Sequence, residues 1–142
     1  MEKIKLDELQ LKIMKVLWEN GESSVGQIQE ILKAEREFAI TTISTILQRL
    51  YKREIVSYRK EGRQYIYSAT ITEFDTQSSM TSNLVDQLFD GKSSVLVNHL
   101  LESDSFESEE LEQLKKMIEE AQKRKENTQQ QPTKNRWVIP ND

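Results

Sequence analysis

Five residues between positions 39 and 53 have side chains suited to binding DNA. A threonine offers a hydroxyl to phosphate oxygens or base edges and a methyl group to thymine, and an arginine can bind guanine through two hydrogen bonds. A lysine adds positive charge, which attracts the phosphate backbone. The five residues are Thr41, Thr42, Thr45, Arg49 and Lys52.

These side chains need a helix to present them together. The segment 39–53 is rich in β-branched residues, which favour strands, but its apolar residues recur at the helical spacing i, i+3, i+4 and i+7. On a helical projection the polar set is centred roughly 130° away from the apolar set. An ordinary exposed helix would favour Ala, Glu or Lys over three threonines, so the polar front is predicted to have a function. The apolar back consists of Ile43, Ile46, Leu47 and Leu50.

Two further basic residues, Lys60 and Arg63, lie in a predicted hairpin, whose loop at residues 60–64 we call the wing. Gly62 suits a turn that requires a positive φ angle. From this loop the cations would reach flanking phosphates or the minor groove, which positions a protein on DNA without reading its sequence. The alternative is that the charges only protect an edge strand. The flanking strand-like segments are 55–59 and 64–69.

The elements before the hairpin complete the order of a known DNA-binding fold. Amphipathic helices are predicted at 6–18 and from Ser24 to about Ala34, each beginning at a capping box. Three helices followed by a hairpin form a winged helix-turn-helix with 39–53 as recognition helix. The sequence thus predicts a mainly α fold with a small β-hairpin. The capping pairs are Asp7 with Gln10 and Ser24 with Gln27.

The second half of the chain is predicted to be helical. Its three short helices have narrow apolar faces that cannot form a good core alone, so they are expected to pack against a second copy of the chain. The predicted domains are a winged helix over 1–71, a helical dimerisation domain over 72–125 and a disordered tail over 126–142. The predicted dimer-interface residues are Leu84, Leu88, Phe89, Leu96, Leu100, Leu111, Leu114 and Ile118.

The tail contains one apolar island, Trp137-Val138-Ile139. Two readings stay open for it: it docks on a surface, or it has no role, since isolated apolar residues are often exposed.

The net charge of −4 argues at first against a nucleic-acid partner, but the charge is unevenly distributed. Residues 1–75 hold twelve basic and twelve acidic residues, so all the surplus acid lies after them. Residues 48–67 carry six basic residues against two acidic ones, a local charge of +4. Binding to phosphates responds to this local field, so a basic recognition segment is compatible with an acidic chain.

The residue types present exclude several classes of function. The chain has no cysteine and one histidine, which rules out disulfides, cysteine-ligated metal and most zinc sites. Ser23, Ser24, Ser93 and Ser94 have no catalytic set of histidine and aspartate near them in sequence, and Gly62 and Gly91 form no phosphate-loop pattern. We therefore expect no enzymatic activity, no cofactor and no metal. His99, on a short apolar helix, is expected to be a partly buried packing residue.

No targeting or membrane segment is evident. No apolar run approaches the ~18 residues of a membrane span, and Met1-Glu2-Lys3-Ile4 does not begin a signal peptide. We expect a cytoplasmic protein without membrane insertion.

Taken together, these segments resemble the penicillinase-repressor (BlaI/MecI/CopY) family of transcriptional repressors. The resemblance covers roughly residues 5–124 and includes the opening helix, the second helix, the recognition helix and the wing. The matching segments are Leu6 to Trp18, Ser24-Val25 with Ile28 and Leu32, Ala39 to Arg53, and Gly62-Arg63 with Tyr65-Ile66-Tyr67.

The resemblance implies a dimeric repressor that binds a palindromic operator in double-stranded DNA and blocks transcription. It places Thr42, Thr45 and Arg49 on the DNA, with Thr41 and Lys52 nearby. Many members are inactivated when a membrane sensor-protease signal leads to cleavage in the middle helix of the dimerisation domain.

The sequence departs from the family at three places. At the family's cleavage site, which is Asn-Phe, this chain has His99-Leu100. The paired C-terminal cysteines of the copper-responsive members are absent, which excludes metal sensing by that route. Glu54 stands where the family often has glycine before the first wing strand.

An alternative function is a winged-helix protein-interaction module that does not bind specific DNA and uses its acidic helices as the contact surface. Winged helices serve both purposes, so the fold alone does not decide. The threonine-rich front and the basic wing favour DNA.

Overall fold

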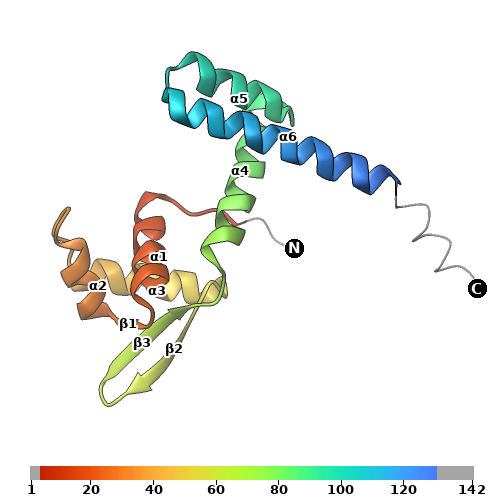
Figure 1. Cartoon of the computed structure of the whole chain (residues 1–142). Helices are drawn as coiled ribbons and strands as arrows, with labels where there is room; N and C mark the ends of the chain where they lie inside the picture. The colour runs from red at the N-terminus through yellow and green to blue at the C-terminus, as the bar shows by residue number, and fades with distance from the viewer. Residues whose placement is uncertain (1–3, 131–142) are drawn as a thin grey trace, which may run out of the picture. The chain divides into compact units, whose positions relative to one another are not determined.

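The computed structural model describes residues 4–130 and divides into two compact units, the first ending at Gly91 and the second beginning at Lys92 (Figure 1). Among these residues the first unit has four helices and a three-stranded sheet, and the second has two helices. The predicted mainly helical fold with a small β-hairpin is confirmed. None of the described helices is long and apolar enough to cross a membrane.

Capping boxes begin the first two helices, as predicted. The Asp7 carboxylate accepts a hydrogen bond from the Gln10 N–H, while the Gln10 side chain accepts one from the Asp7 N–H. Ser24 and Gln27 form the same pair. Because the first N–H groups of a helix have no partner within it, these pairs determine where each helix starts. The helices are α1, Glu8–Asn20, and α2, Val25–Leu32.

The third helix, α3, spans Ile40–Lys52, one residue shorter at each end than predicted. The side chains of Ile43, Leu47 and Leu50 have no exposed surface. Each fully buried aliphatic side chain stabilises the fold by about 1.5–3 kcal/mol, so this face determines which side of α3 meets solvent. The core around it also contains Leu6, Ile13, Met14, Leu17, Ile28, Leu32 and Val56.

The hairpin is confirmed, but its loop is shorter than predicted. Lys60 and Glu61 are paired strand residues, so the wing loop expected at 60–64 is corrected to the two-residue turn Gly62-Arg63. Gly62 has a φ of 62°, and positive φ angles let a two-residue turn match the twist of the paired strands. The strands are β2, Val56–Glu61, and β3, Gln64–Ala69.

A third strand, β1, was not predicted. It comprises Ser23–Ser24 and pairs antiparallel with β3, which gives the sheet order β1-β3-β2. Two residues are too few to show an alternating pattern in sequence. The pairing attaches the base of the hairpin to the start of α2, because Ser24 is also the N-cap of that helix.

Two hydrogen bonds tie helix α4, Glu73–Phe89, and the residues just before it to the winged helix. The Trp18 indole N–H donates to the Ile71 carbonyl at 3.0 Å, and the Ile4 N–H donates to Ser79 Oγ at 2.9 Å. These bonds join the α4 region to α1 and the N-terminal segment within the first unit, whereas the predicted dimerisation domain begins at residue 72. That domain boundary stays a prediction.

The second unit consists of α5, Ser93–Glu102, and α6, Ser108–Gln130. No side chain of residues 92–128 is buried. The disordered tail expected over 126–142 is corrected at its start, because α6 continues to Gln130. Residues 126–130 contain no Gly or Pro, and Pro132, which disfavours helix in the residue before it, lies beyond them. The rest of the tail, with Trp137-Val138-Ile139, lies outside the described residues.

The turn from α3 to β2 places Glu54 in the left-handed region, with a φ of 63°. Its N–H donates to the Tyr51 carbonyl at 2.9 Å, and its carbonyl accepts from Thr70 Oγ1 at 2.6 Å. These bonds hold a conformation that costs an L-residue about 1–2 kcal/mol. This is the position where the family often has glycine.

We expect Glu54→Gly to raise the free energy of unfolding by about 0.5–1 kcal/mol, because relief of the strain exceeds the extra entropy of the unfolded glycine chain. Urea unfolding followed by circular dichroism measures the change. Glu54→Ala is the control, since alanine keeps the strain. An equal gain for both variants, or a loss with glycine, would contradict this account.

Candidate nucleic-acid interface

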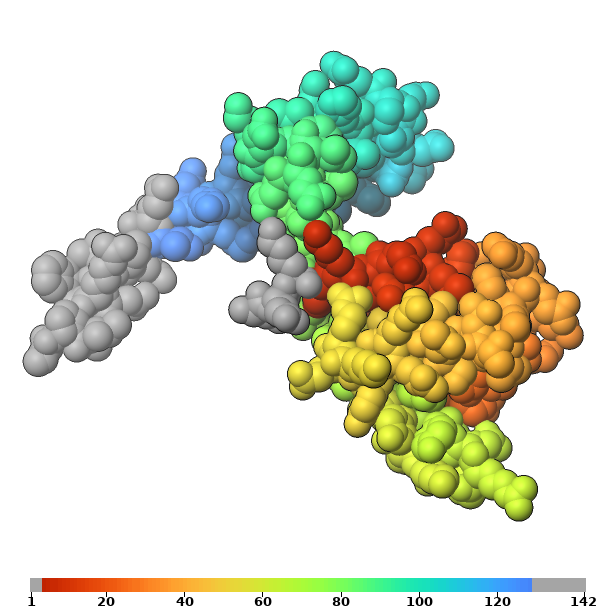
Figure 2. Space-filling view, turned by 180° about the vertical axis from the view of Figure 1, so that it is seen from behind, coloured from red at the N-terminus to blue at the C-terminus, as the bar shows by residue number. Residues whose placement is uncertain are grey.

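The five residues of α3 predicted to bind DNA all lie on its exposed surface. They stand opposite the buried back of the helix, and Figure 2 shows the yellow segment around residue 50 open to solvent on the face in view. Arg49 and Lys52 have no ion-pair partner among residues 4–130, so their charges are available to an external anion.

The N-terminus of α3 differs from those of α1 and α2, because no side chain caps it. Its N-cap residue is Ala39, whose carbonyl accepts hydrogen bonds from the N–H groups of Thr42 and Ile43. Backbone N–H groups at an uncapped helix start can bind an anion such as phosphate. Thr41 and Thr42 lie in this first turn, as the predicted DNA-facing end requires.

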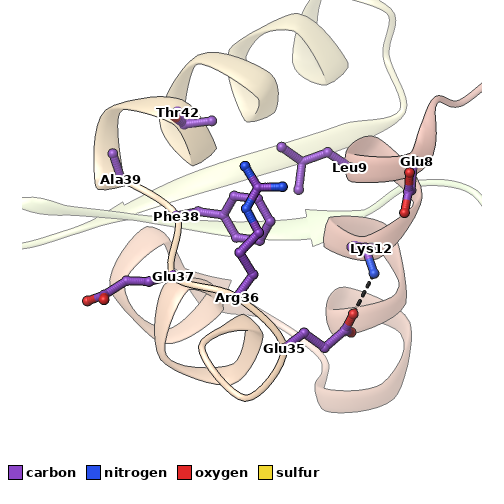
Figure 3. A pocket seen from close by; sticks show the side chains of 9 residues that line it. All are labelled: Glu8, Leu9, Lys12, Glu35, Arg36, Glu37, Phe38, Ala39 and Thr42. Carbon is purple, nitrogen blue, oxygen red and sulfur yellow. Dashed lines mark hydrogen bonds and ion pairs between the residues drawn. The ribbon is translucent and has the colours of Figure 1, made fainter.

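A groove of about 510 Å³ opens beside this N-terminus (Figure 3). Within it the Arg36 guanidinium carbon lies 5.0 Å from the centre of the Phe38 ring. Lys12 is paired with Glu35, which raises the pKa of Lys12. The Gln29 side chain holds the turn by donating to the Phe38 carbonyl at 2.8 Å. The groove walls are Glu8, Leu9, Lys12, Glu35, Arg36, Glu37, Phe38, Ala39 and Thr42.

Arg36 is a further candidate, which was not predicted from the sequence. It is exposed and has no ion-pair partner within the described part of the chain. The available signal was its position in the turn just before the recognition helix, where a cation could reach the same phosphate as the helix N-terminus. The three glutamates in the groove walls make the groove as a whole a poor anion site, so Arg36 is the part of it suited to DNA.

Arg59 differs from the other basic residues of the segment 48–67. Its guanidinium donates two hydrogen bonds to Glu22, at 3.0 and 3.1 Å, and one to Glu61, at 2.9 Å. These carboxylates raise the pKa of Arg59, and Arg59 lowers the pKa of Glu22. The local charge of +4 therefore includes one cation that is already paired, and Arg59 links the hairpin to the loop after α1.

The register of the hairpin sorts its side chains onto two faces. Lys60 is paired with Tyr65, and Tyr58 with Tyr67, so these four side chains share one face. Arg59, one residue from Lys60, lies on the other face. The first face is the one directed to α3, because the Tyr58 ring lies 4.9 Å from the ring of Tyr51 at the end of that helix. Lys60 and the front of α3 thus border the same surface.

The residues predicted to form a dimer interface lie at or near the surface of the single chain. On α4, Leu88 is 66% exposed and Leu84 is 41% exposed. Such apolar surface is unfavourable in water and marks interaction sites. The others are partly buried, namely Phe89, Leu96 and Leu114, or exposed, namely Leu100, Leu111 and Ile118.

His99 is exposed in the chain, so the expectation of a partly buried packing residue is wrong. The helix that carries it, α5, has no buried residue, because nothing within the second unit covers it completely. Across residues 4–130, no group of three or more His, Cys, Asp or Glu side chains is arranged to hold a metal ion.

The chain is similar in sequence to known proteins. The penicillinase repressor of Bacillus licheniformis is 29% identical to the chain over 126 residues, which cover 88% of this chain and 98% of that protein. The methicillin resistance regulatory protein MecI of Mammaliicoccus sciuri is 23% identical over 107 residues, which cover 75% of this chain and 87% of that protein. The solution structure of the DNA-binding domain of the repressor BlaI is 28% identical, with a TM-score of 0.47, over 52% of this chain and 90% of that one.

The family model for the penicillinase repressor matches residues 6–120, which include the winged helix, α4, α5 and half of α6. The match extends over most of the chain, and its bounds agree with the resemblance predicted over roughly residues 5–124. The chain therefore belongs to the penicillinase repressor family of DNA-binding transcriptional repressors.

Proposed function

We propose that this repressor acts as a homodimer that binds a palindromic operator through α3 and blocks transcription. The observation that carries the proposal is the two-sided character of α3: Ile43, Leu47 and Leu50 have no exposed surface, while its threonines and cations are all exposed. A helix of this kind fits the major groove of DNA. Because its ligand is operator DNA, we place the protein in the cytoplasm.

In this proposal the residues of α3 have different roles. Arg49 reads a base by donating two hydrogen bonds to guanine, and the hydroxyls of Thr42 and Thr45 bind phosphates or base edges. Thr41 and Lys52 lie at the two ends of the helix front and bind the backbone. The wing residues Lys60 and Arg63 bind flanking phosphates, which sets the position of the protein without selecting sequence.

The exposed apolar residues of the helices after the winged helix support the dimer. Two identical chains related by a twofold axis bring the same surfaces together, and a palindromic operator has matching symmetry. The interface residues proposed are those of the sequence analysis on α4, α5 and α6, from Leu84 to Ile118.

Control by a sensor-protease pathway also belongs to the proposal, with His99-Leu100 as the bond cleaved. Both residues lie on α5 and are exposed in the single chain.

No observation favours the alternative of a protein-interaction module over DNA binding.

We expect Arg49→Ala to weaken operator binding by about 1–3 kcal/mol while non-specific binding falls less, because a base contact is lost together with one charge. Fluorescence anisotropy, with duplexes from upstream of the chain's own gene and an unrelated duplex of equal length, measures both at several salt concentrations. Arg124→Ala is the control, since it removes the same charge from exposed α6.

Unchanged operator affinity of the Arg49→Ala variant would remove Arg49 from the interface. If the unsubstituted chain binds both duplexes equally at low salt, the repressor assignment gives way to the protein-interaction alternative.

We expect Leu88→Asp to convert the dimer into monomer and weaken operator binding, because the charge would have to be buried in the interface. Analytical ultracentrifugation measures the oligomeric state. Leu88 is 66% exposed, so the substitution leaves the fold of the single chain intact, which circular dichroism checks. Ser82→Asp, an equal charge at an exposed polar position of α4, is the control. A Leu88→Asp variant that remains dimeric would place the interface elsewhere.

A further inference from the structure

Three tyrosines form a continuous surface between α3 and the wing. The ring of Tyr58, on β2, lies 4.9 Å from that of Tyr51, on α3, and 5.0 Å from that of Tyr65, on β3. Beneath them Tyr67 is buried, with its ring 5.7 Å from that of Tyr58. We call Tyr51, Tyr58 and Tyr65 the tyrosine platform.

The platform is half-exposed although it consists of large aromatic rings. The exposed fractions are 46% for Tyr51, 43% for Tyr58 and 45% for Tyr65. A hollow of about 310 Å³ lies against the rings, and none of its lining residues is acidic. The groove beside the N-terminus of α3, in contrast, has three glutamates in its walls. The lining of the hollow is Gln48, Tyr51, Lys52, Tyr58, Tyr65 and Tyr67.

Cations stand at both ends of the platform. Lys52 borders the hollow at the α3 end, and the Lys60 ammonium lies 5.9 Å from the centre of the Tyr65 ring at the wing end. The acidic partners of Arg59 do not compensate these charges, because the hairpin register directs Arg59 to the opposite face. The platform is thus a hydroxyl-bearing aromatic surface with positive ends, which suits an extended polyanion.

The geometry of DNA indicates which polyanion segment this is. In B-DNA a sugar-phosphate strand separates the major groove from the adjacent minor groove. A protein that inserts α3 into the first groove and extends its wing toward the second must therefore pass over that strand. In this molecule the surface that joins α3 to the wing is the tyrosine platform.

We propose that the tyrosine platform binds the sugar-phosphate strand between the two grooves, with the hydroxyls of Tyr51, Tyr58 and Tyr65 donating hydrogen bonds to phosphate oxygens. This inference rests on the proposed function and adds residues that the sequence analysis did not include. Tyrosine hydroxyls are common donors to phosphates, and such contacts position a protein without reading bases. The rings cover the sugars, and Lys52 and Lys60 neutralise phosphates at either end.

A purely structural role for the platform makes a different prediction. Phenylalanine would keep the ring packing between α3 and the hairpin strands, because it has the same ring and lacks only the hydroxyl. The triple variant Tyr51→Phe, Tyr58→Phe and Tyr65→Phe therefore separates hydrogen bonding from packing. Tyr67→Phe is the matched control, because it makes the same chemical change at a buried position.

The experiment uses the full chain and a duplex selected by it from a random library, with an unrelated duplex for comparison. We expect the triple variant to bind both duplexes at least roughly tenfold more weakly, with their ratio unchanged, because bonds to a charged acceptor are lost but no base contact is. Tyr67→Phe is expected to bind within about twofold of the unsubstituted chain. Undiminished affinity of the triple variant would overturn the proposal.

A second measurement uses selected duplexes with single neutral methylphosphonate linkages. At the linkages that face the platform, the neutral linkage should weaken binding by the unsubstituted chain. It should not weaken binding by the triple variant any further, because that variant already lacks the bonds to those phosphates. If the loss of affinity caused by the neutral linkage adds to the loss caused by the triple substitution at every linkage, the proposal is overturned. If the unsubstituted chain selects no duplex at all, the proposed function itself fails. If the chain selects DNA, and its binding depends on Arg49 but not on the tyrosines, only this inference is overturned.

Discussion

The burial of one face of α3 is the constraint on which the rest of the interface depends. Ile43, Leu47 and Leu50 are completely covered by the core, and rotating the helix would expose all three. Since exposing them would cost several kcal/mol, the threonine and arginine side has one possible orientation, toward solvent. The three threonines lower the intrinsic stability of the helix, and this burial compensates for it. Packing thus determines where the DNA-binding side chains point.

The sheet extends the same surface beyond the helix. Pairing of β1 with β3, and of Arg59 with Glu22, attaches the hairpin to the body of the winged helix at two points. The register of β2 and β3 then places Lys60 and the tyrosines on the face toward α3 and the paired Arg59 on the other. Strand alternation therefore separates the charges of the hairpin onto its two faces. A count of basic residues along the sequence does not show which face each charge is on.

Much of this architecture follows from local patterns in the sequence. Capping pairs and helical periodicity predict the starts of α1 and α2 and the two faces of α3, because each depends on residues within a few positions of one another. What the sequence did not reveal depends on distant segments. The pairing of Arg59 with Glu22 joins residues 37 positions apart, and the tyrosine platform combines a helix with two strands. The prediction of disorder is wrong over residues 126–130, where α6 continues, because polar composition does not prevent a helix from continuing.

The central claim is that the exposed front of α3 lies in the major groove of an operator. The chain has no cysteine, so a single Thr45→Cys substitution carrying an azidophenacyl photo-crosslinker probes one position of that front without further changes. The same label on Lys15→Cys, an exposed position of α1, serves as the comparison. The account predicts that illumination of the complex crosslinks the Thr45 position to bases within the operator and leaves the Lys15 position uncrosslinked. Absence of crosslinks from the Thr45 position in a complex that still binds operator, or equal crosslinking from both positions, would contradict it.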